Sequence, residues 1–247
     1  MKYFLLLVVS LVSHAVWAGA TPPAPDTIAE RVKPCLACHS PGGRVGKDAY
    51  YPRLSGKPQG YLYNQLLNFK QARRHSRPMN LLVENLSDEY LAEIAAYFAA
   101  QPPRYVAPRD GAGVKPGATP PPLLTQGDPA RKIPACIACH GKTLTGVVPH
   151  IPGLLGLPAD YISAQFGAWK TGTRRASEPD CMGGIARQLD TTEVGAIAAW
   201  LAAQPLSSDA HAADALPEEL PLRCGSVTAT VKVTGKAAGK IMPKARP

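Results

Sequence analysis

The chain has 247 residues, a formal net charge of +9 at pH 7, and an aromatic content of only 6%. This length allows one or two domains, but so few aromatic side chains would make a thin core unless bound groups contribute apolar volume. A basic surface can bind nucleic acid, but the predicted export of the chain argues against that partner. For an exported protein the positive charge favours an acidic protein partner or peripheral association with an anionic membrane surface.

Residues 1–18 have the pattern of a secretory signal peptide. Lys2 precedes an apolar run, and small residues surround Ala18, so we expect cleavage there, with Ala20 as the alternative. An uncleaved membrane anchor is the competing interpretation, but the apolar run is short for a bilayer. We therefore predict export to the periplasm of a Gram-negative host.

Two pentapeptides carry the strongest chemical signal. They are Cys35-Leu36-Ala37-Cys38-His39 and Cys136-Ile137-Ala138-Cys139-His140. The Cys-x-x-Cys-His spacing is typical of covalent c-type haem attachment, in which Cys35, Cys38, Cys136 and Cys139 form thioethers and His39 and His140 bind iron. We therefore predict two covalently attached haem c cofactors.

Two other uses of paired cysteines do not fit the sequence. A zinc ribbon needs a second closely spaced ligand pair near each motif, and the sequence has none. A thioredoxin-like redox pair should follow a strand in a βαβ pattern, whereas the flanks of both motifs are rich in proline and the later segments predict helices.

The two halves of the chain repeat each other in the same order of parts. In each half we expect a helix after the haem motif, over 59–70 and 159–170. A last helix should follow Ser87 in the first half and Asp190 in the second, since these residues are good N-caps. Leu91, Ile94, Ala95 and Phe98 follow helical spacing, as do their counterparts Val194, Ile197, Ala198 and Leu201.

The repeat predicts an all-α protein of two tandem domains. We place the first domain at 19–101, a proline-rich extended linker at 102–126 and the second domain at 127–205. Residues 206–247 are expected to form a loop followed by a basic tail, which is either solvated or a docking tail for an acidic partner.

Met79 and Met182 occupy equivalent positions before the last helix of each half. Such a methionine is often core packing, but both are expected in loops that contain proline or glycine, where simple core filling is unusual. A thioether sulfur favours ferrous iron and raises its potential. We predict Met79 and Met182 as the second axial ligands of the two irons.

Each half resembles a class I cytochrome c, and the whole resembles the two-domain diheme cytochromes c of the c-four type, which are periplasmic electron carriers. The resemblance includes Tyr51-Pro52-Arg53-Leu54-Ser55-Gly56, Tyr61 with Gln65, and Met79-Asn80. It implies that the carbonyls of Pro52 and Pro152 orient the histidine ligands. Arg53 has Gly153 as its counterpart, which departs from a strict repeat.

Electron transfer between redox partners of a respiratory chain is the leading functional prediction. Two six-coordinate irons leave no position for a substrate, so we expect a carrier and not an enzyme. Its partners would be acidic redox proteins or a membrane-bound oxidase or reductase. The alternatives are a haem subunit of a periplasmic dehydrogenase, such as a flavocytochrome, and a diheme peroxidase, which would need a vacant iron site.

The remaining polar residues give weaker signals. Cys181 and Cys224 are left over as a pair in a chain predicted to be exported, so we expect a disulfide, with two free thiols as the alternative. His75 and His150 have no repeat counterparts and are expected on the surface. Arg74 and Arg174 repeat, and either pair with haem propionates or lie on a solvated face.

Overall fold

The structure, a computed structural model, describes residues 25–39, 51–103, 113–207 and 210–228. The predicted signal peptide and most of the predicted basic tail lie outside these residues. The described elements are α1 Ile28–Arg31, α2 Lys33–Leu36, α3 Gln59–Lys70, α4 Arg77–Val83, α5 Asp88–Ala100, α6 Pro122–Thr125, α7 Cys136–His140, β1 Gly146–Val147, β2 Ile151–Pro152, α8 Ala159–Lys170, α9 Cys181–Gln188, α10 Thr191–Ala203 and α11 Gly225–Thr228.

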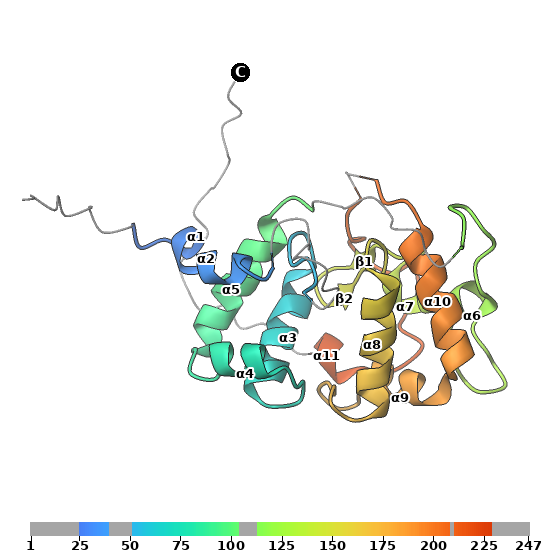
Figure 1. Cartoon of the computed structure of the whole chain (residues 1–247). Coiled ribbons are helices and arrows are strands. Elements are labelled where there is room, and N and C mark those ends of the chain that lie inside the picture. The colour runs from blue at the N-terminus through green and yellow to red at the C-terminus, as the bar shows by residue number, and fades with distance from the viewer. Residues whose placement is uncertain (1–24, 40–50, 104–112, 208–209, 229–247) are drawn as a thin grey trace, which may run out of the picture.

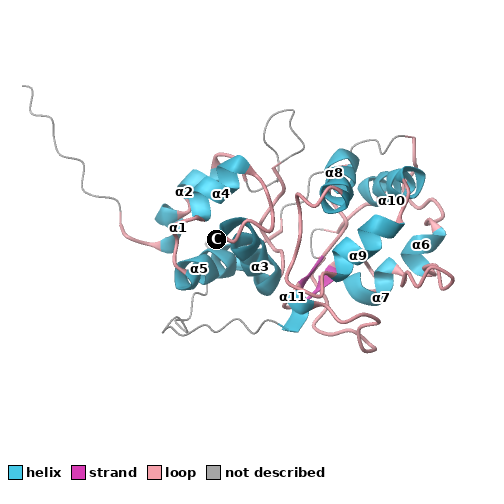
Figure 2. Cartoon of the chain, turned by 90° about the horizontal axis from the view of Figure 1, so that it is seen from below, coloured by secondary structure: helices cyan, strands magenta, loops and turns pink. Residues whose placement is uncertain are grey.

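The two halves fold into two helical units that lie side by side (Figure 1). Helices α1–α5 belong to the first unit and α6–α10 to the second, with α3 and α8 flanking the junction. The sheet in the described residues is one antiparallel pair, β1 with β2 (Figure 2). The prediction of an all-α fold with two tandem domains is confirmed.

The last helix of each unit forms because its caps and its apolar stripe agree. Ser87 accepts a hydrogen bond from the backbone of Tyr90 at 3.2 Å, and Asp190 exchanges bonds with Glu193 in a capping box. These caps satisfy amides that have no partner within the helix. The predicted stripes of α5 and α10 are buried.

Each unit has its own apolar core. In the first, α5 packs on α3 around Phe98, and a second cluster of Phe69, Val83 and Leu91 includes the half-buried Met79. In the second, α10 packs on α8 around Ile197 and Leu201.

The structure changes two sequence-based expectations. The end of the predicted linker is not extended, because α6 forms there and places Leu124 fully buried in the second core. Met79 and Met182 lie in the short helices α4 and α9, not in loops. Pro78 is compatible with the first turn of α4, and Asp180 caps α9 through Gly183 at 2.9 Å.

Candidate functional site

The two histidines of the repeated motifs are held in the same way. Nδ1 of His39 lies 2.9 Å from the carbonyl oxygen of Pro52, and Nδ1 of His140 lies 2.8 Å from that of Pro152. Because a carbonyl only accepts, each Nδ1–H must donate, which leaves the lone pair of Nε2 available for a metal. Burial also lowers the pKa of both imidazoles, which favours the neutral, ligating form.

The cysteines of the second motif lie on α7 and face a cavity of about 190 Å³. We call it the second cavity because it adjoins the second motif. Cys136, Cys139 and His140 line it together with Met182 of α9. Burial, with a smaller contribution from Cys139, raises the pKa of the Cys136 thiol to about 11. A thioredoxin-like thiol would instead have a lowered pKa.

The zinc interpretation has no support in the geometry either. Over residues 25–39, 51–103, 113–207 and 210–228, no three His, Cys, Asp or Glu side chains converge as metal ligands would. The second cavity instead places a histidine nitrogen and a methionine sulfur on the lining of one apolar space. That ligand pair suits haem iron.

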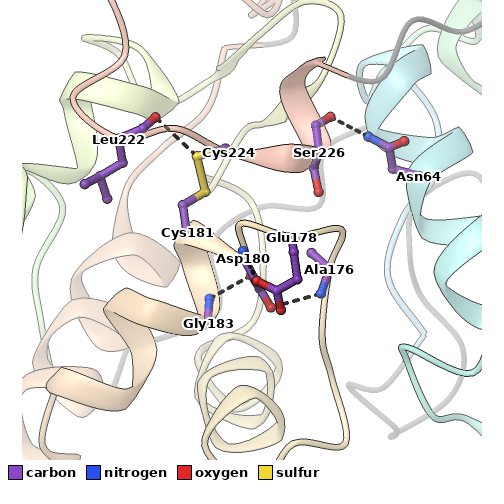
Figure 3. The surroundings of a disulfide bond; sticks show 9 residues. All are labelled: Asn64, Ala176, Glu178, Asp180, Cys181, Gly183, Leu222, Cys224 and Ser226. Carbon is purple, nitrogen blue, oxygen red and sulfur yellow. Dashed lines mark hydrogen bonds between the residues drawn. A yellow bond between two sulfur atoms is a disulfide. The ribbon is translucent and has the colours of Figure 1, made fainter.

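The predicted disulfide between Cys181 and Cys224 is present, with the two Cα atoms 5.3 Å apart. It ties the segment before α11 to the first residue of α9, directly before Met182 (Figure 3). Beyond the disulfide, the carbonyl of Ser226 accepts a bond from Asn64 of α3 at 2.7 Å. The segment 220–227, here called the strap, therefore covers the methionine side of the second cavity and also reaches the first unit.

Two repeated arginines meet across the junction. Arg74 donates to Gln65 of its own unit and to Gln165 of the other, both at 2.8 Å. Arg174 donates to Gln165 at 2.6 Å and to Gln65 at 3.3 Å. The crossed bonds form a closed arrangement in which each guanidinium is shared between the units.

Aromatic rings support both guanidiniums. Arg74 lies over Phe69 at 4.7 Å and Arg174 over the equivalent Trp169 at 3.8 Å. Arg174 is only 7% exposed, so the solvated alternative is wrong for this residue. The repeat identified both arginines, but it carries no information that they would pack against each other.

The junction carries an unusual excess of buried positive charge. Lys57 is also 7% exposed, and burial together with Arg53, Arg174 and Arg74 lowers its pKa to about 7. No ion pair among the described residues joins Lys57, Arg74 or Arg174 to a carboxylate. Buried cations without acidic partners are costly, so this cluster suits an anionic ligand.

His75 lies on the surface as expected, but His150 does not. His150 is half-buried and lies against the backbone of Gly60 of α3. Nε1 of Trp169 is buried without a hydrogen-bond partner in the described structure, and both side chains line the second cavity. Sequence reasoning missed His150 because the residue it packs against belongs to the other repeat.

The residues present fit a covalently attached haem. The second cavity is lined by apolar side chains around a neutral histidine and a thioether, and its lining also includes Lys57, Arg174 and the partnerless Nε1 of Trp169. Such donors satisfy the two propionates of a haem. The roles of the thioether cysteines, of His39 and His140, and of Met79 and Met182 remain predictions.

The sequence is similar to those of known electron-transfer proteins. The chain is 38% identical over 195 residues to a thiosulfate dehydrogenase electron acceptor of Thiomonas intermedia, which covers 78% of this chain and 85% of the relative. It is 31% identical to cytochrome c4 of Pseudomonas aeruginosa over 79% of this chain and 96% of the relative. No family model matches the chain.

Structural comparison gives the same result. The cytochrome c4 structure of Acidithiobacillus ferrooxidans superposes with a TM-score of 0.56 at 27% identity, and the match covers 70% of this chain and 99% of that one. The relative from Pseudomonas aeruginosa matches over nearly its whole length, so the likeness includes both repeats and not a single domain. The chain therefore belongs to the cytochrome c4 family, and is a diheme electron-transfer cytochrome that carries two covalently bound haem c groups.

Proposed function

We propose that this protein is a periplasmic carrier that accepts electrons from thiosulfate dehydrogenase or a similar oxidising enzyme and delivers them to a respiratory acceptor. The observation that carries the proposal is the duplicated histidine geometry, with both Nε2 atoms free and both Nδ1 atoms fixed by proline carbonyls. The relative in Thiomonas intermedia is named as the electron acceptor of such a dehydrogenase, which supports the choice of donor.

The chain's own residues would keep each metal site unchanged through a redox cycle. When bound, each haem supplies an iron that alternates between the ferrous and ferric states. Pro52 and Pro152 hold the imidazoles in one tautomer, and the strap lines the second cavity together with Met182. Fixed ligands in an apolar pocket would keep the structural change on electron transfer small.

The cationic cluster of Lys57, Arg74 and Arg174 would hold the haem propionates at the junction of the two domains. Its guanidiniums are already fixed by Gln65 and Gln165, so little order is lost when an anion binds. Lys57 and Arg74 belong to the first repeat and Arg174 to the second, so the cluster would supply positive charge for the propionates of both haems. Electrons could then pass between the domains within one molecule.

The site supports a carrier and not a catalyst. Met182 lines the same cavity as His140, so a second protein ligand is available for that iron, whereas a peroxidase needs an open position.

Among the helices that the structure describes, none has the length and apolar character of a membrane span. We place the protein in the periplasm, after removal of its predicted signal peptide.

A permanent dehydrogenase subunit is the second candidate, because the relative's name ties it to one enzyme. Native purification separates the two. A carrier elutes alone and exchanges between donors, whereas a subunit co-elutes with the dehydrogenase at fixed stoichiometry.

The direct test uses purified thiosulfate dehydrogenase, thiosulfate and the oxidised cytochrome in stopped flow. We expect both haems to be reduced, with the absorbance change of two haems per chain. Absence of reduction, with intact haem spectra and an active dehydrogenase, would reject this donor.

A further inference from the structure

The second cavity is partly lined by a segment that lies beyond both repeats. This segment is the strap, residues 220–227, and its Cys224 is joined to Cys181 with the two Cα atoms 5.3 Å apart (Figure 3). Cys181 is the first residue of α9, and Met182 follows it directly. The covalent link therefore acts on the helical turn that carries the predicted iron ligand.

Backbone contacts also hold the strap against the loop that precedes α9. The amide of Gly225 donates to the carbonyl of Pro179 at 3.0 Å. A Cβ atom on Gly225 would overlap the carbonyl oxygen of Glu178, so the two backbones approach too closely for any side chain. Asp180, which caps α9, belongs to the same loop. The strap, this loop and the start of α9 therefore pack as one piece, of which the disulfide is only one attachment.

The strap turns apolar side chains towards the cavity. Leu220, Leu222 and Val227 line it together with Met182. Cys224 is also part of the lining and is only 8% exposed. These side chains add apolar surface to the haem pocket that the repeated domain by itself does not contain.

A further bond ties the strap to the first unit. The side chain of Asn64 on α3 donates to the backbone carbonyl of Ser226 at 2.7 Å (Figure 3). Asn64 is buried, and a buried amide that loses its acceptor bears the full cost of its desolvation. The strap is thus fixed at three places, which are α9, the loop before α9 and the first unit.

The first repeat cannot form the same covalent link. Pro78 occupies the position equivalent to Cys181, and the first half of the chain contains no cysteine besides Cys35 and Cys38 of the haem motif. A disulfide at this position of the first repeat is therefore excluded. In an otherwise duplicated chain, the disulfide and the strap that it anchors belong to the second methionine alone.

We propose that the strap is a positioning element for the second haem, in which the Cys181–Cys224 disulfide keeps Met182 on the iron and Leu222 keeps the surroundings of that haem apolar. The inference rests on the predicted ligation of iron by Met182. It is independent of which enzyme donates electrons to the protein. The two cysteines position a ligand and carry no electrons themselves.

Two physical effects follow from this role. A thioether favours ferrous over ferric iron, so Met182 is most easily displaced in the oxidised protein, and a fixed start of α9 lowers the population in which it has left the iron. Ferric haem carries one more positive charge than ferrous haem, and apolar surroundings disfavour the form with more charge. The strap should therefore protect the methionine bond and raise the potential of the second haem, without acting on the first.

The first experiment measures how firmly Met182 is held. Imidazole is a good ligand for iron, and its titration into the ferric diheme protein is followed by the loss of Met-to-iron absorption. In the variant Cys181→Ser with Cys224→Ser, one of the two haems should bind imidazole about tenfold more tightly, because the population without methionine grows by that factor. The other haem should keep its wild-type affinity.

A glycine pair tests the strap without touching the disulfide. Gly225→Ala forces the strap away from the loop before α9 and should also tighten imidazole binding at one haem. Gly167→Ala is the matched control, because a Cβ atom at this position of α8 meets open space. It should bind imidazole as the wild type does.

The second experiment measures the two haem potentials. In a spectroelectrochemical titration of the full diheme protein, the step that Met182→Ala lowers belongs to the second haem. Leu222→Asn replaces an apolar side chain by a polar one of similar size, and should lower this step by about 59 mV, which is tenfold in the ratio of oxidised to reduced haem. Leu222→Met keeps the site apolar and should leave both steps at their wild-type values.

The outcomes separate the ligand prediction from the role of the strap. If Met182→Ala keeps both Met-to-iron bands, the ligation on which the inference rests is wrong. Wild-type imidazole affinity in the double serine variant, or an equal gain at both haems, would refute the positioning role. An equal fall in potential in Leu222→Met and Leu222→Asn would refute the apolar role of Leu222. None of these measurements uses thiosulfate dehydrogenase, so its failure to reduce the protein would reject the proposed donor and leave the strap's role standing.

Discussion

Removing the disulfide should destabilise the second domain by a predictable amount. Cys181 and Cys224 are separated by 43 residues, and the chain-entropy relation for a loop of this length gives about 4 kcal/mol at 25 °C. The variant is Cys181→Ser with Cys224→Ser, which leaves all four predicted haem thiols in place. With a urea m-value of about 2 kcal/mol per molar, the unfolding midpoint of this domain should fall by about 2 M.

The assay is a urea titration of the haem-loaded protein, followed by the near-infrared Met-to-iron band and by circular dichroism. The band of the second domain should disappear at lower urea, because the strap no longer holds α9 and its Met182. The first domain is the internal reference. Ser226→Ala is the matched control, since it alters the strap but keeps the disulfide and the backbone carbonyl that Asn64 binds.

Two results would contradict this reasoning. A loss below about 1 kcal/mol in the double serine variant would mean that the bond does not restrict the unfolded chain as the entropy relation requires. An equal loss in Ser226→Ala would assign the effect to strap packing and not to the covalent link.

Four further outcomes are expected. Met79→Ala or Met182→Ala should each abolish one Met-to-iron band and lower one haem potential, and retention of both bands in the double variant would show other ligands. Intact mass of the exported protein should show two added haems and the loss of the signal peptide; a single haem in mature protein would contradict two loaded domains. The rate of reduction by an acidic protein donor should fall as salt rises, since the Debye length shortens from about 10 Å at 0.1 M to about 3 Å at 1 M, and a rate indifferent to salt would mean purely apolar docking. Burial and three arginines lower the pKa of Lys57 from 10.5 to about 7. Without a bound anion, Lys57 is therefore protonated in the unfolded chain but neutral in the folded chain between pH 7 and 10.5. The free energy of unfolding then rises with pH over this range. Propionates at the cluster should cancel that depression, so the stability difference between wild type and Lys57→Met should stay flat from pH 7 to 10.5; a difference that grows with pH in favour of the wild type would place the propionates elsewhere.

Much of the fold could be predicted because local signals and the repeat agree. The bounds of α3 and α8 match the prediction to the residue, and the caps at Ser87 and Asp190 form as expected. The proline carbonyls lie where the family resemblance implies. In each case the determining contacts are close in sequence, or are copied in both halves.

What the sequence did not reveal lies where the halves meet. Gln65 and Gln165 could be aligned as repeat partners, but a repeat compares equivalent positions and says nothing about contacts between copies. The shared guanidinium bonds and the burial of Lys57 depend on how α3 and α8 approach each other. The position of His150 depends on the same junction, because its neighbour Gly60 belongs to the other domain.

The divergence between the repeats is also a matter of packing, and it bears on function. In the run Leu81-Leu82-Val83 all three residues are apolar, and the sequence alone would assign them equally to a core. The structure buries Val83 and exposes the two leucines, while the disulfide draws the strap over the corresponding face of the second domain. Equivalent positions of the two repeats thus differ in their surroundings because of contacts that no local sequence signal records.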